Sequence, residues 1–278
     1  VASLLAGSPE RIVFNLVEDF AADADDASLV PAFVRAHGKE CVGGDWPCLA
    51  LTTDKWQTRA ILEAAGLPVA RGVLVPVGGR YEPRRLPAGR VIVKPVASDA
   101  SEGIDEDAVG PRDGPGVRRA IRRVHEQFAQ AALVEEYVAG REVNVSLWER
   151  AGKVAALPLA EIDFEGYGRA RPHIVGYRAK WVPGTPQYHG LGRVLPARLP
   201  AGTAARLHRL AEAAWRVTGC RDYARVDLRL RRDGTPVILE VNINPDLSLD
   251  AGFAAALRAG RVPYHRFVAA MVGNAAAR

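Results

Sequence analysis

Two acidic residues in the last quarter of the chain have the types and spacing of a metal site. Asp227 and Glu240 lie in two runs of alternating apolar residues that flank Asp233-Gly234, and an Asp-Gly pair between such runs is a strong sign of a β-hairpin. If that pair forms a two-residue turn, Asp227 lies directly opposite Glu240. The same count places Arg225 opposite Asn242, and period-2 alternation puts all four side chains on one face of the sheet.

Two carboxylates that face each other across a hairpin repel unless a cation lies between them, because their Cβ atoms are about 4.5–5.5 Å apart. Neither run contains His or Cys, and oxygen ligands alone suit Mg²⁺ or Mn²⁺. The alternative is that Asp227 and Glu240 pair with Arg225 or other arginines on a solvated face. The hairpin alone leaves both interpretations open, since a turn one residue longer would shift the register.

Length and composition indicate a globular protein with two or three compact subdomains. The chain has 278 residues, of which 48% are hydrophobic, and a chain of this size buries proper cores. No apolar run reaches the ~18–20 residues of a membrane span, so no membrane partner is expected. Three cysteines without CxxC spacing, Cys41, Cys48 and Cys220, indicate buried apolar side chains in a reducing compartment. The predicted location is therefore cytoplasmic.

The charge of the chain leaves open a nucleic-acid partner. The net charge is +5, the pI is near 9.3, and arginines cluster at 118–123. However, apolar residues at 117, 121, 124 and 128 form one stripe of a helix, which places these arginines on its solvated side. Aromatic residues make up only 7% of the chain, and no nucleic-acid-binding motif is present. No nucleic-acid partner is therefore expected.

Lysine is rare in this chain, which draws attention to the lysines that it keeps. Only five of the 37 basic residues are lysines: Lys39, Lys55, Lys94, Lys153 and Lys180. A compact ammonium group serves a phosphate oxygen differently from a planar guanidinium group. Lysines inside recognisable local motifs are therefore candidates for function.

Hydrophobic periodicity and turn residues predict alternating strands and helices. Strands are expected at 12–16, 72–77, 91–95, 132–137, 141–149 and 154–160, and helices at 28–36, 54–65, 117–128, 203–218 and from 250 onward. An acidic loop should follow the first strand, and a polar loop should occupy 98–116. The segment 163–194 is rich in Gly, Pro and aromatic residues, which suits an irregular cover over a site.

Four polar motifs follow one another along these elements. Asp54-Lys55 opens a helix, Lys94-Pro95 ends a buried strand, 135–142 carries three glutamates, and the hairpin comes last. Each motif alone is more often structural than functional. Together they fit a nucleotide site, in which lysines neutralise phosphates, a carboxylate takes the ribose hydroxyls and acidic residues hold Mg²⁺.

This order resembles the ATP-grasp superfamily, and within it the D-alanine–D-alanine ligase group. The resemblance runs through Phe14–Glu18, Leu51–Lys55, Val93–Pro95, Val134–Glu142, Tyr177–Lys180, Tyr223–Asp227 and Leu239–Pro245. It implies an α+β ATP-grasp fold, in which two α/β subdomains with antiparallel sheets clamp ATP. We expect these subdomains at 51–138 and 139–278, preceded at 1–50 by a remnant of an N-terminal α/β domain.

The resemblance also implies a set of nucleotide-binding residues. Lys55 and Lys94 match the lysines that contact phosphate, and the loop with Ser101 and Gly103 matches the phosphate cover. The remaining matches are the adenine-binding hinge at Glu135, Glu136 and Val138, the ribose contact at Glu142, and the γ-phosphate contact at Lys180.

Metal ligands and catalytic residues are implied in the same way. Asp227, Glu240 and Asn242 match the ligands of two Mg²⁺ ions. Arg225 matches the arginine that stabilises the acyl phosphate and the tetrahedral intermediate. The expected catalytic residues are Arg225, Lys180 and Ser101.

The implied function is an ATP- and Mg²⁺-dependent carboxylate–amine ligase that forms an amide bond through an acyl phosphate. Its substrates would be small amino acids or peptides, and a homodimer is possible. The alternative is a nucleotide-binding remnant that has lost ligase turnover.

The sequence departs from the family pattern on the acceptor side of the site. The loop at 98–101 keeps one of two expected serines, Trp181 replaces a tyrosine after Lys180, and Asp246 replaces a glycine. The serine expected for the second amino acid falls at Ala251 or shifts to Ser248. ATP is therefore better supported than D-alanine as a substrate, and Asp246 is a hypothetical contact for an amine.

Overall fold

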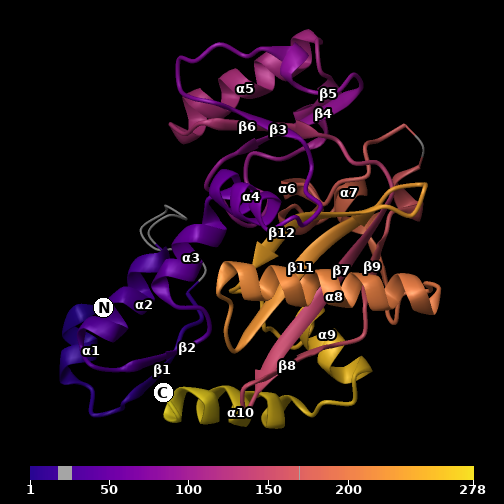
Figure 1. Cartoon of the computed structure of the whole chain (residues 1–278). Helices are drawn as coiled ribbons and strands as arrows, with labels where there is room; N and C mark the ends of the chain where they lie inside the picture. The colour runs from indigo at the N-terminus through magenta and orange to yellow at the C-terminus, as the bar shows by residue number, and fades with distance from the viewer. Residues whose placement is uncertain (18–26, 169) are drawn as a thin grey trace.

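The computed structural model describes residues 1–17, 27–168 and 170–278. Within them the strands form a four-stranded antiparallel sheet, a six-stranded antiparallel sheet and a two-stranded parallel sheet. Figure 1 shows the four-stranded (small) sheet above the six-stranded (large) sheet. This mixed architecture with antiparallel sheets agrees with the predicted fold class.

The small sheet forms one side of the cavity described below. Its strands lie in the order β3 (Gly72–Val75), β6 (Ala132–Glu136), β4 (Arg90–Pro95) and β5 (Val109–Pro111). Helix α5 (Pro115–Phe128) packs on it through the predicted apolar stripe, with Val117, Ile121 and Val124 buried. The expected loop at 98–116 is thus shorter than predicted, because β5 and the 3₁₀ helix η3 (Glu106–Ala108) lie within it.

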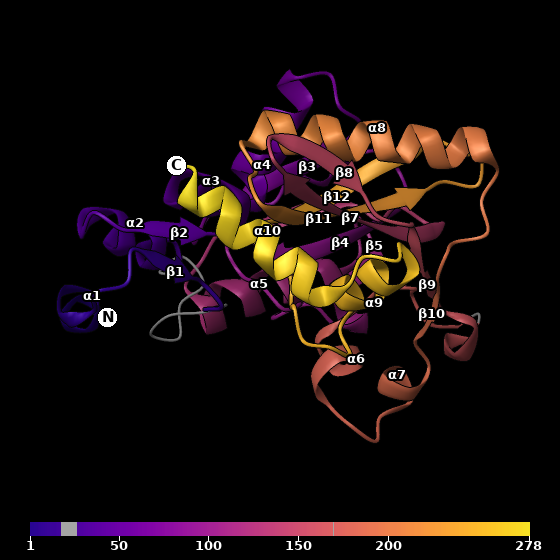
Figure 2. The same ribbon diagram turned by 90° about the horizontal axis from the view of Figure 1, so that it is seen from below.

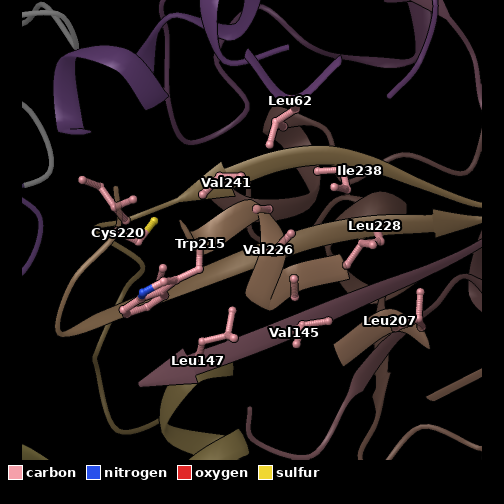
Figure 3. Packing of buried hydrophobic residues seen from close by; sticks show 14 of the residues in the cluster. Leu62, Val145, Leu147, Leu207, Trp215, Cys220, Val226, Leu228, Ile238 and Val241 are labelled. Atoms are coloured by element: carbon pink, nitrogen blue, oxygen red, sulfur yellow. The ribbon is translucent and has the colours of Figure 1, made fainter. Parts of the chain in front are cut away.

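The large sheet carries the main core. Its strands are β7 (Arg141–Arg150), β8 (Lys153–Ala156), β9 (Ala160–Asp163), β10 (Gly192–Val194), β11 (Tyr223–Leu230) and β12 (Pro236–Asn242). Helix α8 (Ala201–Thr218) covers one face, and Figure 3 shows Leu207 and Trp215 of this helix among Val145, Val226 and Leu228 of the strands. Helix α10 (Tyr264–Ala276) lies across the sheet from α8 (Figure 2).

The single strand predicted at 154–160 is wrong. The structure has two strands there, β8 and β9, and both pair with the long strand β7. Leu157 and Leu159, between the two strands, are buried. The apolar run that suggested one strand therefore includes a buried connection.

The hairpin of β11 and β12 has the predicted partners at the site. Asp227 pairs with Glu240, and Arg225 pairs with Asn242. Strand β11 also pairs with β7 on its other side. The four side chains thus lie on β11, which is paired on both sides, and on β12, which is the last strand of the large sheet.

The predicted two-residue turn is wrong, although the pairing is right. Arg231 N donates to the carbonyl of Thr235 at 2.9 Å, so three residues form the turn. Leu228 pairs with Ile238, which leaves Leu239 as the extra residue of a β-bulge. The longer turn shifts the register by one position and the bulge shifts it back.

The N-terminal part adds a small unit beside the large sheet. It contains α1 (Ala2–Gly7), β1 (Ile12–Phe14), α2 (Leu29–Ala36), β2 (Glu40–Val42) and α3 (Trp46–Thr53). β1 and β2 pair in parallel, and α10 contacts both. The acidic loop predicted after the first strand, with Glu18, falls mainly on residues 18–26, outside the described residues.

The remaining helices are short, and three of them, α4, α6 and α9, contribute residues to the cavity described below. They are α4 (Lys55–Ala64), α6 (Tyr177–Trp181), α7 (Pro186–His189), α9 (Gly252–Ala259) and the 3₁₀ helices η2 (Pro83–Arg85) and η4 (Glu165–Tyr167). Asp54 caps α4 by accepting a hydrogen bond from Gln57 N at 2.8 Å, as expected for a helix that begins there. Among the described residues, no helix is long and apolar enough to cross a membrane. Cys41, Cys48 and Cys220 are buried, as predicted.

Candidate active site

A cavity of about 540 Å³ lies between the small and large sheets. The residues expected to bind the nucleotide or the metal, or to take part in catalysis, all line it except Gly103 and Asn242. The structure thus brings together residues that are up to 185 positions apart, from Lys55 to Glu240. Cavities of this size between two sheets suit a nucleotide or another small ligand.

Lys94 and Glu135 form an ion pair on the small-sheet side of the cavity. Their charged atoms are 2.8 Å apart, and the two side chains are 13% and 9% exposed. Burial by itself would lower the pKa of Lys94, but the adjacent Glu135 carboxylate outweighs it and raises that pKa. Lys94 therefore keeps its positive charge inside the cavity.

Glu136 lines the cavity and pairs its carboxylate with the hairpin turn of the large sheet. Arg231 donates to this carboxylate from Nη1 at 2.6 Å and from Nη2 at 2.9 Å. This bidentate pair ties the end of β6 to the hairpin turn. Between Glu136 and Glu142, the chain turns at Gly140, whose φ is +147°. The hinge expected at 135–138 is thus fixed to both sheets.

Glu142 has a partner that the sequence analysis did not identify. Arg229 donates to Glu142 Oε2 from Nε at 3.0 Å and from Nη2 at 2.6 Å. The same guanidinium donates to the carbonyls of Val138 and His173, and it lies 5.8 Å from the ring centroid of Tyr137. Arg229 therefore joins the hinge, the expected ribose contact and the segment that covers the cavity.

Arg225 and Asp227 pair along one strand. Arg225 Nε and Nη2 lie 2.8 and 2.9 Å from the two oxygens of Asp227. Asn144 of β7 also donates to Asp227, at 2.7 Å. Burial would lower the pKa of Arg225, but Asp227 outweighs it and the pKa is raised. The sequence left open whether Asp227 pairs with an arginine, and in the structure it pairs with Arg225.

Glu240 differs from the other carboxylates of the cavity. Within the described part of the chain it has no ion pair within 4.0 Å, whereas Glu135, Glu136, Glu142 and Asp227 each have one. It is partly buried, and its charge acts on Lys94 and Lys180. A free carboxylate opposite Asp227 fits an oxygen-ligand site for Mg²⁺.

Asn242 lies next to this pair but outside the cavity wall. Its Oδ1 accepts a hydrogen bond from Asn244 N at 2.9 Å. An amide oxygen has two lone pairs, so one remains for a cation. The set of Asp227, Glu240 and Asn242 thus has the donor chemistry for Mg²⁺, and its role stays a prediction.

The loop at 98–105 meets the segment 171–189 over the cavity. Ser101 Oγ donates to the carbonyl of Val175 at 2.7 Å, and Trp181 Nε1 donates to the carbonyl of Ala100 at 2.9 Å. Tyr177 N donates to the carbonyl of Ile104 at 2.8 Å. These contacts hold the two segments together, so the cavity has a cover.

Gly103 serves packing in this structure. A Cβ atom there would lie 2.7 Å from Pro95 Cγ and 2.9 Å from Phe128. Its φ of +69° also favours glycine. The residue therefore allows the loop to approach the small sheet closely, and it does not line the cavity.

Two lysines face the cavity without a carboxylate partner among the described residues. Lys55 Nζ donates to the carbonyl of Ser98. Lys180 is exposed, and partial desolvation together with the positive charge of Arg225 lowers its pKa. Both ammonium groups lie near the covering loop, where phosphates are expected.

The sequence analysis did not identify two arginines of the cavity wall, Arg229 and Arg193. Arg229 has the same side-chain direction as Arg225 and Asp227, because the three alternate along β11, so the pattern contained a signal for it. Arg193 lies in the segment predicted to be irregular, and the sequence contained no such signal. Asp246, the hypothetical amine contact, is exposed and does not line the cavity.

The comparisons with known proteins identify the family. A family model described as D-ala D-ala ligase C-terminus matches residues 85–273. The chain belongs to the D-alanine–D-alanine ligase family. It is 33% identical to D-alanine–D-alanine ligase A of Mesorhizobium japonicum, over 82% of this chain and 62% of that protein. It is also 33% identical to a D-alanine–D-alanine ligase of Anaeromyxobacter sp., over 78% of this chain and 70% of that protein.

Solved structures of the family share the fold. The VanG D-Ala:D-Ser ligase from Enterococcus faecalis superposes with a TM-score of 0.75 at 19% identity, over 95% of this chain and 72% of that chain. D-alanine–D-alanine ligase from Bacillus anthracis complexed with ATP gives 0.70 at 18% identity, over 89% and 74%. The predicted ATP-grasp fold and ligase resemblance are confirmed. Family membership implies ATP-dependent amide-bond formation.

Proposed function

We propose that this protein is an ATP- and Mg²⁺-dependent carboxylate–amine ligase that works through an acyl phosphate. The observation that carries this proposal is the pairing of Asp227 with Glu240 on the wall of a cavity that also contains Lys55 and Lys180. Two opposed carboxylates next to ammonium groups that have no carboxylate partner among the described residues suit a metal-bound triphosphate. Its substrates would be small amino acids or peptides.

The reaction needs no nucleophilic side chain. A carboxylate oxygen of the first substrate attacks the γ-phosphorus of ATP, which gives an acyl phosphate and ADP. The amine of the second substrate then attacks the acyl carbon, phosphate leaves, and the amine loses a proton. The protein contributes positioning and charge stabilisation, for which Lys180 and Arg225 are placed at the cavity wall.

The residues that would hold Mg²⁺ are Asp227, Glu240 and Asn242. When bound, Mg²⁺ would neutralise phosphate charge and orient the γ-phosphate. Asp227 already accepts from Arg225 and Asn144, so it would share its oxygens between these donors and a cation. Arg225 is thereby placed beside the proposed metal site.

The adenine and ribose would lie at the hinge. The carboxylates of Glu135 and Glu136 are engaged by Lys94 and Arg231, so the base would be contacted by hinge backbone groups, such as those of Val138. Oε2 of Glu142 accepts both bonds from Arg229. Its other oxygen is the one proposed to accept a ribose hydroxyl.

The test is Mg²⁺-dependent release of phosphate from ATP with a panel of D-amino acids, L-amino acids and dipeptides. We expect at least one pair of substrates to stimulate release and to give an amide product by mass spectrometry. ATP binding without stimulation by any member would contradict the proposal, and would favour a nucleotide-binding protein without ligase turnover.

A further inference from the structure

The segment that follows β12 is held by residues of the N-terminal unit. Ile243 is 2% exposed, and a Cβ atom at Gly44 would lie 1.9 Å from its Cδ1. The side chain of Asn244 donates from Nδ2 to the carbonyl of Val17 at 2.7 Å. Its Oδ1 accepts from the hydroxyl of the buried Tyr223 at 3.4 Å. Both polar atoms of this side chain are thus engaged, one by the N-terminal unit and one by the large sheet.

The carbonyl of Val17 is itself held in place. The backbone N of Val17 donates to Oδ1 of Asn15 at 3.1 Å, and Asn15 is 5% exposed. Phe14, the last residue of β1, stacks on Tyr223 of β11 with ring centroids 6.5 Å apart. The acceptor that Asn244 uses therefore belongs to a part of the N-terminal unit that packs on the large sheet.

Asn244 also closes a turn onto Asn242. Its backbone N–H donates to Oδ1 of Asn242 at 2.9 Å, the pattern in which an asparagine side chain bonds to the backbone two residues further on. An amide oxygen has two lone pairs in one plane, so this bond determines where the second lone pair points. A side chain that fixes residue 244 thereby fixes the direction in which Asn242 offers its oxygen to a cation.

We propose that Asn244 is a positioning residue for the metal ligand Asn242, and that through it the N-terminal unit supports the metal site. Asn242 is a metal ligand only under the proposed function, on which this role therefore rests. Among the described residues, none before Lys55 lines the cavity. The N-terminal unit thus acts on the site through the hydrogen bond from Asn244 to Val17 and without touching the ligand.

The test measures cation binding, so that it does not depend on turnover. Wild type, Asn244→Leu and Asn242→Leu are saturated with ADP and titrated with Mn²⁺. Electron paramagnetic resonance measures the free ion, and Mn²⁺ held by unbound ADP is subtracted. Leucine keeps the size of the side chain and the backbone N–H of residue 244, but it removes both side-chain hydrogen bonds. We expect the Mn²⁺ affinity of Asn244→Leu to fall about 10-fold, as for other residues that orient metal ligands, and that of Asn242→Leu to fall at least as far.

Asn274→Leu is the matched control. Asn274 is also half-buried, and it donates from Nδ2 to the carbonyl of Glu149 at 3.0 Å and to Asp222 at 3.1 Å. The variant therefore loses hydrogen bonds of the same kind at a place where Asn242 is not a partner. Denaturant unfolding should show losses of stability in both Asn274→Leu and Asn244→Leu, whereas only Asn244→Leu should lose Mn²⁺ affinity.

Asn244→Ala, which adds no apolar bulk, replaces the leucine variant if that variant does not fold, and the same fall is expected. Wild-type Mn²⁺ affinity in the Asn244 variant, or an equal loss in Asn274→Leu, would overturn the positioning role. Unchanged affinity in Asn242→Leu, or no saturable Mn²⁺ binding in wild type, would overturn it as well. Affinity lost in the Asn244 variant but not in Asn274→Leu, without phosphate release by wild type, would uphold the positioning role and reject only the ligase function.

Discussion

Arg229 donates two hydrogen bonds to a single oxygen of Glu142, at 3.0 Å from Nε and at 2.6 Å from Nη2. The arginine side chain is 3% exposed and the glutamate side chain 10%. This geometry neutralises Glu142 and fixes its carboxylate, and within the part of the chain that the structure describes Oε1 accepts no hydrogen bond. The pair therefore links the stability of the large sheet to the proposed recognition of ribose.

Replacement of Arg229 by Met should destabilise the protein, because it leaves the buried Glu142 without a cation. Loss of one partner of a buried pair lowers the free energy of unfolding by about 3–5 kcal/mol, and denaturant unfolding measures it. Arg231→Met is the matched control. Its pair with Glu136 is 31% and 23% exposed, so the expected loss is about 1 kcal/mol or less. Equal losses in the two variants would contradict the role given to burial.

Replacement of Glu240 by Gln should abolish Mg²⁺-dependent turnover while the protein still folds. The variant keeps the shape of the side chain but loses one of two opposed carboxylates, so affinity for the metal falls. Phosphate release and circular dichroism measure the two effects. Glu126→Gln, on the exposed side of α5, should leave both unchanged. Near-normal ATP consumption in Glu240→Gln would reject the metal assignment.

The pH profile of kcat/KM for ATP should report Lys180. Desolvation and the charge of Arg225 lower its pKa, and the charged form is the one that can bind phosphate. Activity should therefore fall with rising pH from below the usual lysine value of about 10.4. Lys180→Arg should move this alkaline limb to higher pH, because guanidinium stays charged. If the alkaline fall in activity stays at the same pH in Lys180→Arg, a group other than Lys180 causes it.

Replacement of Gly140 by Ala should prevent stable folding. A Cβ atom there would lie 1.8 Å from the carbonyl oxygen of Leu230, at a φ of +147°. Backbone must move at both the hinge and the hairpin, so we expect a loss of about 3 kcal/mol or more. Gly152→Ala is the control, since its φ of +73° is strained but its Cβ meets nothing within 4 Å. It should lose about 1 kcal/mol, and thermal melts compare the two.

The sequence predicted the parts of the site that local geometry determines. A hairpin fixes which residues face each other, so Asp227 and Glu240 could be paired without a structure, and alternation along β11 also contained Arg229. The order of motifs along the chain identified the fold. The pairs of Lys94 with Glu135 and of Arg231 with Glu136 depend on how two distant strands approach each other. Spacing within the sequence does not encode such distances.

Arg193 was unpredictable for a related reason. It belongs to a three-residue strand, Gly192–Val194, in a segment whose Gly, Pro and aromatic content suggested irregular structure. That strand exists because β9 supplies hydrogen-bond partners, which is a tertiary effect. Glycine in a polar loop fits a phosphate cover as well as it fits close packing against Phe128, so the sequence did not reveal the packing of Gly103, and its role in a phosphate cover stays a prediction.

The bulge at Leu239 isolates the reactive face of the hairpin from its exposed tip. An added residue in the turn would by itself slide one strand by one position and send Glu240 to the opposite face of the sheet. Here a single irregularity next to Glu240 absorbs that slip. The composition of the tip can therefore change without moving Glu240. A change in the length of the tip keeps Glu240 on the same face only if the bulge changes as well.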